Sequence, residues 1–169
     1  GEWVSKFPED TKKIAREGHE IGNHGDNHKH MTSLSREEQK KEIRDLHEKV
    51  RLLTGKDMEL FRPPYGDYDD TVITTARENG YEPIQWSVDS LDWKEYGREA
   101  MITQTVDNKN LTEGAILLLH TGTLYTKEAL PEILHRIKEK GYHFVLVSQL
   151  IYKSDFYIDF SGKQYKKSR

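Results

Sequence analysis

The sequence contains no cysteine, and its longest uninterrupted apolar run is Ala-Ile-Leu-Leu-Leu at residues 115–119. The lack of cysteine excludes a disulfide framework and any metal site built on thiolates. The lack of a longer apolar run excludes a membrane-spanning helix, which needs about 20 such residues. What remains is a chain with neither thiol chemistry nor a membrane span.

The charges show no large excess of one sign. There are 26 Lys and Arg residues against 29 Asp and Glu residues, and they are interspersed except in the basic tail Lys-Gln-Tyr-Lys-Lys-Ser-Arg. This distribution argues against a nucleic-acid-binding protein. With 169 residues, of which 34% are hydrophobic, the chain is long enough for one domain with a sizeable core.

One local order recurs three times: a polar amphipathic run, then a glycine, then a short apolar run. The glycines are Gly18, Gly80 and Gly141. Glycine just after a helix can adopt the left-handed cap conformation without a side-chain penalty, and the apolar run that follows suits a buried strand. The order therefore predicts alternating helices and strands.

The expected helix starts agree with this alternation. Pro8 suits the first turn of a helix, and Ser35 with Glu38 forms a capping-box pattern before the amphipathic run 40–55. Further helices are expected near 69–78, 98–108 and 126–140. Strands are expected near 19–22, 59–61, 81–86, 115–119 and 143–147.

Regular alternation with continuous apolar strands indicates a parallel α/β sheet or barrel that is buried on both faces. The expected strands are fewer than the roughly eight of a closed barrel of this type. Residues 153–169 do not continue the pattern, and Ser161-Gly162 between two alternating runs predicts a small peripheral hairpin there.

Polar residues follow four of the apolar runs, which is where chemistry gathers in parallel α/β proteins. The four clusters are His24-Gly25-Asp26-Asn27-His28, Arg62-Pro63-Pro64-Tyr65-Gly66, Asp89-Ser90-Leu91-Asp92-Trp93 and His120-Thr121-Gly122.

His24 and His28 stand four residues apart, a spacing that lets two imidazoles bind one divalent ion. Histidines at this spacing also occur by chance, so the pair alone leaves both a metal site and a polar loop open. We expect His19 to belong to a strand. His30 has no partner in the pattern, and both residues are interpreted as structural rather than as ligands.

The other clusters allow a structural as well as a functional interpretation. Residues 62–66 form a rigid turn, or they offer the Arg62 guanidinium to a carboxylate and backbone N–H groups to an oxyanion. The acids of residues 89–93 cap a helix or act in a site, and Trp93 is either core or a platform for a sugar ring. His120 directly follows a buried strand, where an imidazole can transfer protons near neutral pH or be a satisfied core group.

Four segments, in this order, closely resemble motifs two to five of the NodB-homology polysaccharide deacetylases, carbohydrate esterase family 4. They are Gly-His-Glu-Ile-Gly-Asn-His-Gly-Asp-Asn-His, Arg-Pro-Pro-Tyr-Gly, Asp-Ser-Leu-Asp-Trp and Ile-Leu-Leu-Leu-His. The match runs over residues 1–152, which would be the C-terminal part of such a domain, with 153–169 as a peripheral extension. The resemblance implies a distorted (β/α) barrel of about seven strands and metal-assisted hydrolysis of N-acetyl groups on amino sugars.

The resemblance also implies roles for the first two clusters. His24 and His28 would bind the metal, most often zinc, with cobalt and nickel as alternatives. Arg62 would help orient the catalytic carboxylate, and the Tyr65 backbone N–H would help bind the oxyanion. Pro64 and Tyr65 would also contact the substrate.

For the last two clusters, the resemblance implies that His120 is the general acid and that Asp92 pairs with it. Trp93 and Leu118 would line the acetyl pocket. These roles suit the chemistry, because amide hydrolysis needs a polarised carbonyl, an activated water and a proton for the leaving amine.

The family's first motif, an Asp-Asp pair that provides the general base and the third metal ligand, is not found. Asp69-Asp70 starts an expected helix and is interpreted as capping charge. The first strand, first helix and second strand of the family are also missing from the pattern, and Gly1 is not methionine. We therefore expect the chain to be a C-terminal piece of a longer, active precursor, and to be inactive alone.

A second departure from the family pattern is Gly25, which stands where the family usually has Ser or Thr.

The expected function is that of a metal-dependent hydrolase that removes N-acetyl groups from peptidoglycan or a chitin-like polysaccharide, outside the cell or at the cell wall. Its partners would be the polysaccharide and the missing N-terminal segment of the same precursor. The alternatives are an O-acetyl xylan esterase that uses the same residues and a non-catalytic glycan-binding homologue.

Overall fold

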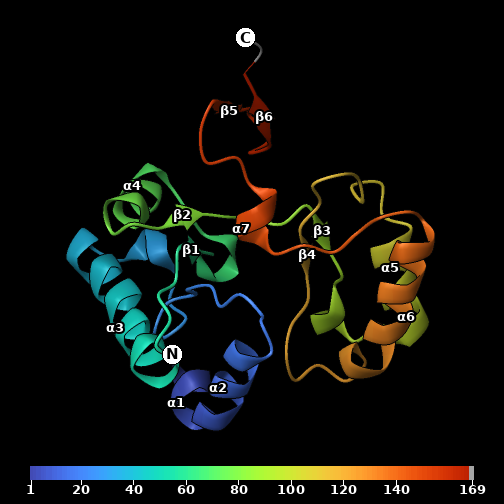
Figure 1. Cartoon of the computed structure of the whole chain (residues 1–169), viewed down its shortest axis with the longest axis horizontal. Coiled ribbons are helices and arrows are strands. Elements are labelled where there is room, and N and C mark those ends of the chain that lie inside the picture. Colours follow the sequence, from blue (N-terminus) through green and yellow to red (C-terminus); the bar gives the residue numbers. More distant parts are fainter. Residues whose placement is uncertain (168–169) are drawn as a thin grey trace. The chain divides into compact units, whose positions relative to one another are not determined.

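The computed structural model describes residues 1–167 and divides the α/β chain into two compact units, Gly1–Gln85 (unit 1) and Trp86–Arg169 (unit 2) (Figure 1). Each unit has its own hydrophobic core. No helix within the described residues has the length and apolar character needed to cross a membrane. The sequence pattern marks no boundary near residue 85.

Unit 1 contains helices, two short 3₁₀ helices (η) and a two-stranded parallel sheet. The elements are α1 (Glu2–Lys6), α2 (Pro8–Arg16), η1 (Met31–Ser33), α3 (Arg36–Thr54), β1 (Leu60–Phe61), η2 (Pro64–Gly66), α4 (Asp70–Glu78) and β2 (Glu82–Pro83). β1 pairs with β2, and Asn23 forms a parallel bridge to Phe61. This bridge places the segment before His24 beside β1.

The ends of α3 and α4 follow their sequence signals. The Ser35 hydroxyl accepts the Glu38 N–H at 3.4 Å, and the Glu38 carboxylate accepts the Ser35 N–H at 2.8 Å, so the predicted capping box is confirmed. Asp69 accepts the Val72 N–H at 2.8 Å, which confirms its interpretation as a helix cap.

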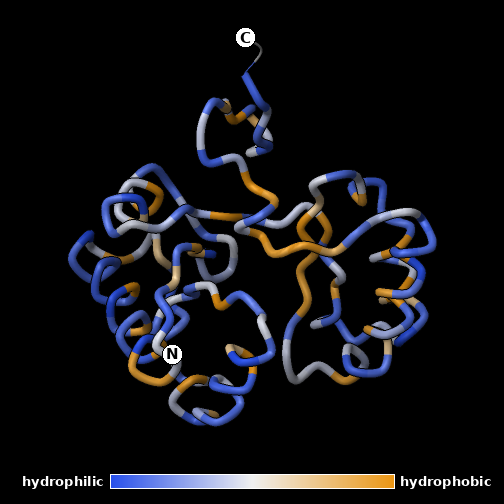
Figure 2. Tube along the Cα trace, viewed as in Figure 1, coloured by the Kyte–Doolittle hydropathy of each residue, from blue (hydrophilic) through white to orange (hydrophobic). Residues whose placement is uncertain are grey.

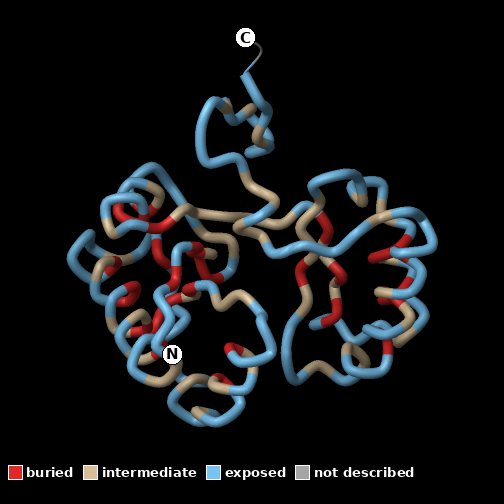
Figure 3. The backbone as a smooth tube through the Cα atoms, viewed as in Figure 1, coloured by how far each residue is buried: buried red, intermediate tan, exposed pale blue. Residues whose placement is uncertain are grey.

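The core of unit 1 is formed by the inner faces of α3 and α4 with β1. Its buried members are Met31, Ile43, Leu46, Val50, Met58, Phe61, Val72, Ala76 and Tyr81. Figure 3 shows buried positions along β1 and on one side of α3. The loop that carries His24 and His28 therefore begins at the edge of a packed core.

Unit 2 contains β3 (Val88–Asp89), η3 (Asp92–Lys94), α5 (Arg98–Val106), β4 (Leu117–Leu118), α6 (Thr126–Glu139), α7 (Val147–Leu150), β5 (Phe156–Ile158) and β6 (Gln164–Lys166). β3 and β4 are parallel, with Asp89 opposite Leu118. The core lies between α5 and α6, where its buried members are Met101, Ile102, Val106, Ala129, Ile133 and Ile137. β5 and β6 are antiparallel, so the predicted hairpin is confirmed.

Two expected strands are wrong. Residues 19–22 are irregular, with His19 exposed, and only Asn23 makes a bridge. Residues 143–146 lie outside every strand, and α7 begins at Val147. Figure 2 shows the hydrophobic run that leads into α7, in which Val145 is 54% exposed. An apolar run becomes a strand only when another strand pairs with it, and here neither segment has one along its length.

Candidate functional site

His24 and His28 lie on the loop between the Asn23 bridge and η1. His24 is half-buried and His28 is exposed, and their rings meet edge to face with centroids 4.8 Å apart. Two imidazoles that share one tetrahedral zinc ion hold their ring centres about 5 Å apart, since each nitrogen lies about 2.1 Å from the ion. The observed separation fits that arrangement.

The environment of His24 favours the form that binds a metal. Its Nδ1 lies 2.5 Å from the Arg62 carbonyl oxygen, so Nδ1 carries the proton and Nε2 presents its lone pair. Burial lowers the pKa of His24 to about 4, which keeps the imidazole neutral at physiological pH. The two histidines therefore suit a divalent metal, although residues 1–167 place no third His, Asp or Glu close enough to complete a ligand set.

The backbone explains why glycine follows His24. Gly25 has φ +76, a left-handed conformation that other residues adopt at a cost. A Cβ atom there would also lie 3.4 Å from the Glu42 carboxylate. Glycine therefore suits this backbone better than Ser or Thr would.

The segment 62–66 follows β1 and forms η2. Pro63 and Pro64 are buried, whereas Tyr65 is 60% exposed and has φ +61. Among the described residues no carboxylate forms an ion pair with the half-buried Arg62 guanidinium. Burial lowers the pKa of Arg62. An unpaired, partly desolvated guanidinium is costly, and a carboxylate ligand would relieve that cost.

His30, which has no partner in the sequence pattern, makes structural contacts beside the histidine pair. Its ring stacks on Tyr65 with centroids 4.0 Å apart, and the edge of His28 meets the same tyrosine at 4.6 Å. His30 Nδ1 also lies 3.5 Å from the Asp67 carboxylate. No residue spacing predicts this contact, because it depends on how the turn at Tyr65 folds against the histidine loop.

In unit 2, Asp92 and His120 form a tightly held pair. The buried Asp92 carboxylate accepts the His120 backbone N–H at 2.6 Å and the ring Nδ1–H at 2.7 Å. It also accepts the Thr126 hydroxyl at 2.9 Å. Burial acts to raise the pKa of Asp92, but these hydrogen bonds prevail and lower it. Thr126 carried no signal in the sequence.

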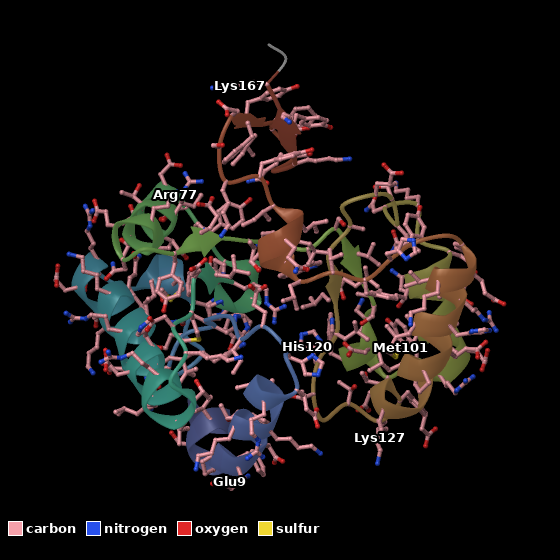
Figure 4. All side chains as sticks on the ribbon, viewed as in Figure 1. Glu9, Arg77, Met101, His120, Lys127 and Lys167 are labelled. Carbon is pink, nitrogen blue, oxygen red and sulfur yellow. The ribbon has the colours of Figure 1, made fainter. Side chains whose placement is uncertain are left out.

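The exposed His120 ring, labelled in Figure 4, is 42% accessible, so it can reach a substrate while Nδ1 is held. The tautomer that donates Nδ1–H to Asp92 directs Nε2 away from the carboxylate. Leu118, two residues earlier on β4, is buried, and Trp93 is 55% exposed. Trp93 is therefore not a core residue of unit 2.

Unit 2 also contains a cavity of about 160 Å³ beside Asp92, lined partly by Tyr96, Met101, Gln104 and Tyr125. Sites for drug-sized ligands usually measure 300 Å³ or more. The cavity is therefore too small for a disaccharide.

Comparison with known proteins agrees with these features. The polysaccharide deacetylase family model matches residues 1–84. A peptidoglycan-N-acetylglucosamine deacetylase of Bacillus cereus is 40% identical over 153 residues, which cover 88% of this chain and 70% of that protein. The chain belongs to the polysaccharide deacetylase family. A peptidoglycan-N-acetylmuramic acid deacetylase of Bacillus subtilis is 32% identical, with 92% of this chain and 60% of the relative covered.

Solved structures of the same family are similar throughout most of the chain. A carbohydrate esterase family 4 pseudoenzyme from Bacillus anthracis superposes with a TM-score of 0.82 at 29% identity, covering 89% of this chain and 52% of the other. A family 4 carbohydrate esterase from Streptomyces lividans, in complex with acetate, gives a TM-score of 0.75 at 29% identity. The match covers 80% of this chain and 69% of that structure. The chain thus spans between about half and 70% of these relatives.

Proposed function

We propose that this chain carries the metal-binding and proton-donating residues of a polysaccharide N-deacetylase, which hydrolyses the amide bond of N-acetyl groups on amino sugars. The observation that carries the proposal is the pairing of the exposed His120 ring with the buried Asp92 carboxylate. The named activities of the Bacillus relatives favour peptidoglycan as the substrate.

His24 and His28 would hold the metal, most often zinc, with cobalt and nickel as alternatives. When bound, such a metal polarises the acetyl carbonyl and lowers the pKa of a water molecule. The proposal needs one further acidic ligand and a general base, which the described residues do not place beside the two histidines. The chain by itself should therefore release little or no acetate.

His120 would act as the general acid. Protonated at Nε2, it gives that proton to the amine nitrogen as the carbon–nitrogen bond breaks, so that the amino sugar leaves uncharged rather than as an anion. Asp92 supports this step because its charge stabilises the imidazolium and its hydrogen bond to Nδ1 orients the ring.

The remaining residues would bind and orient the substrate. We assign Trp93 and Leu118 to the acetyl pocket, Pro64 and Tyr65 to substrate contacts, and the Tyr65 backbone N–H to the oxyanion. The unpaired Arg62 guanidinium suits the orientation of a catalytic carboxylate. The similarity to family 4 structures supports a distorted barrel of about seven strands in the complete domain, and peptidoglycan as substrate implies action at the cell wall.

A non-catalytic glycan-binding role is the second candidate. It is favoured by the similar pseudoenzyme structure and by the lack of a three-residue ligand set in residues 1–167. Esterase action on acetylated xylan by the same residues is a third, supported by the similar family 4 carbohydrate esterase.

Acetate release from N-acetylglucosamine oligomers and from peptidoglycan, by the protein as its gene encodes it and with zinc present, tests the proposal. We expect turnover by the wild type, and loss of turnover in His120→Ala with zinc content nearly unchanged, because His120 is not one of the proposed metal ligands and its side chain is held by Asp92. Glycan binding without acetate release would favour the non-catalytic candidate. Release from acetylated xylan alone would favour the esterase.

A further inference from the structure

Asn23, the residue before His24, is 1% exposed, and its side-chain amide is fully hydrogen-bonded. Its Oδ1 accepts the Gly25 N–H at 3.0 Å. Its Nδ2 donates to the Ile43 carbonyl at 2.8 Å and to the Tyr81 hydroxyl at 3.2 Å. A primary amide has two N–H donors, so both are used.

The backbone of Asn23 is held as firmly as its side chain. Its N–H donates to the Leu60 carbonyl at 2.7 Å, and its carbonyl accepts the Arg62 N–H at 2.9 Å. The bridge and the amide contacts join the residue before His24 to β1 and α3, and the Asp26 N–H adds a further link to α3 by donating to the Glu42 carbonyl at 3.1 Å. Together with the hydrogen bond from His24 Nδ1 to the Arg62 carbonyl, they position His24.

The Tyr81 hydroxyl belongs to a chain of hydrogen bonds that reaches the surface. Nε2 of His47 lies 3.2 Å from the Asp57 carboxylate, which accepts hydrogen bonds only, so Nε2 is the donor of that pair. In this tautomer Nδ1 of His47 is the acceptor, and the Tyr81 hydroxyl, 2.5 Å away, donates to it. Tyr81 is buried, and burial raises the pKa of its hydroxyl, which therefore stays protonated and remains a donor.

We propose that Tyr81 is a positioning residue for the His24 loop, acting through the Asn23 amide, and that His47 with Asp57 fixes the direction of the Tyr81 hydroxyl. The proposal rests on the proposed function in taking His24 as a metal ligand. The Ile43 carbonyl and the Gly25 N–H fix which end of the Asn23 amide is the donor, and the Tyr81 oxygen accepts the second N–H of that amide. Without the Tyr81 hydroxyl, one buried N–H of Asn23 loses its acceptor, which weakens the hold of the amide on the Gly25 N–H.

The test compares Tyr81→Phe with Tyr142→Phe in the 169-residue chain. The control is matched, because the Tyr142 hydroxyl donates one hydrogen bond of 3.0 Å, to the Leu111 carbonyl in unit 2. Three quantities are measured by NMR or titration: the hydrogen exchange rate of the Gly25 amide, the ¹⁵N shifts that report the His24 tautomer, and the dissociation constant for Co²⁺.

In Tyr81→Phe we expect Gly25 exchange to rise by about tenfold relative to the control, a mixed His24 tautomer, and Co²⁺ binding weakened by about fivefold. Tyr142→Phe should leave all three unchanged, although it also loses a hydrogen bond. His47→Ala should have a smaller effect, and it should add nothing in the Tyr81→Phe background, because both changes act on one path.

Equal Gly25 exchange in the two tyrosine variants, or additive effects of Tyr81→Phe and His47→Ala, would overturn the positioning role. Failure of the metal assignment has a different signature, since Co²⁺ binding would then be unaffected by His24→Ala. Gly25 exchange decides the role of Tyr81 in either case, because that readout needs neither metal nor turnover.

Discussion

At the residue scale, the candidate site depends on side chains whose protonation is set by their neighbours. The resemblance of the motifs to the NodB-homology deacetylases was enough to predict that Asp92 and His120 would pair. Thr126, His30 and Tyr81 were not predictable, since each joins the site through the folding of a separate element. These three residues are recognised only by their contacts in the folded chain, and residue spacing in the sequence does not predict those contacts.

The lowered pKa of Asp92 predicts an acid-dependent contribution to stability. Its hydrogen bonds hold the pKa below the usual 3.8, so the unfolded chain binds this proton at higher pH than the folded protein does. The stabilisation is complete above about pH 4 and is lost as the pH falls through the lowered value. We expect the free energy of unfolding of Asp92→Asn, measured in urea, to fall less steeply than that of the wild type below pH 4. Asp10→Asn, at an exposed position of α2, is the control, and parallel curves for wild type and Asp92→Asn would contradict the assignment.

At the scale of single elements, helices were predicted better than strands. A helix satisfies its own backbone, so caps and periodicity suffice, as with Ser35 and the glycines at positions 18, 80 and 141, which all have positive φ. A strand needs a partner, and its sequence does not say whether one is present. The run 143–147 has the composition of a strand, but residues 143–146 pair with no other strand and residue 147 begins α7.

The capping box of α3 gives a test at this scale. Ser35→Ala removes the hydroxyl that accepts the Glu38 N–H, and it should reduce the free energy of unfolding by about 1 kcal/mol. Chemical denaturation monitored by circular dichroism measures this change. Ser5→Ala in the exposed part of α1 is the matched control and should change stability by less than about 0.5 kcal/mol. Equal losses in the two variants would show that the cap contributes nothing specific.

At the scale of the whole molecule, the chain has two separate cores. The buried residues of unit 1 and those of unit 2 form distinct clusters. Unit 1 carries His24, His28, Arg62 and Tyr65, and unit 2 carries Asp92 and His120. The sequence predicted a continuous α/β pattern over 1–152, and its alternation of helices and strands gave no sign of this division, because local patterns do not reveal which core a side chain joins.

The two cores predict that destabilisation is local to one unit. Ile43→Ala and Ile133→Ala each remove a fully buried side chain, and each should cost about 2 to 5 kcal/mol. We expect the first to accelerate amide hydrogen exchange chiefly in residues 1–85, and the second chiefly in residues 86–167. Equal acceleration across the chain in both variants would show that the two units unfold as one cooperative structure.

The central claim is that His24 and His28 form the metal-binding part of a deacetylase site. A zinc titration of the chain, followed by NMR of the histidine rings, tests it most directly. The account predicts that the His24 and His28 signals respond first, and that the double variant His24→Ala/His28→Ala loses this response while the remaining histidines behave as in the wild type. A first response at other histidines, or an unchanged zinc affinity in the double variant, would contradict the account.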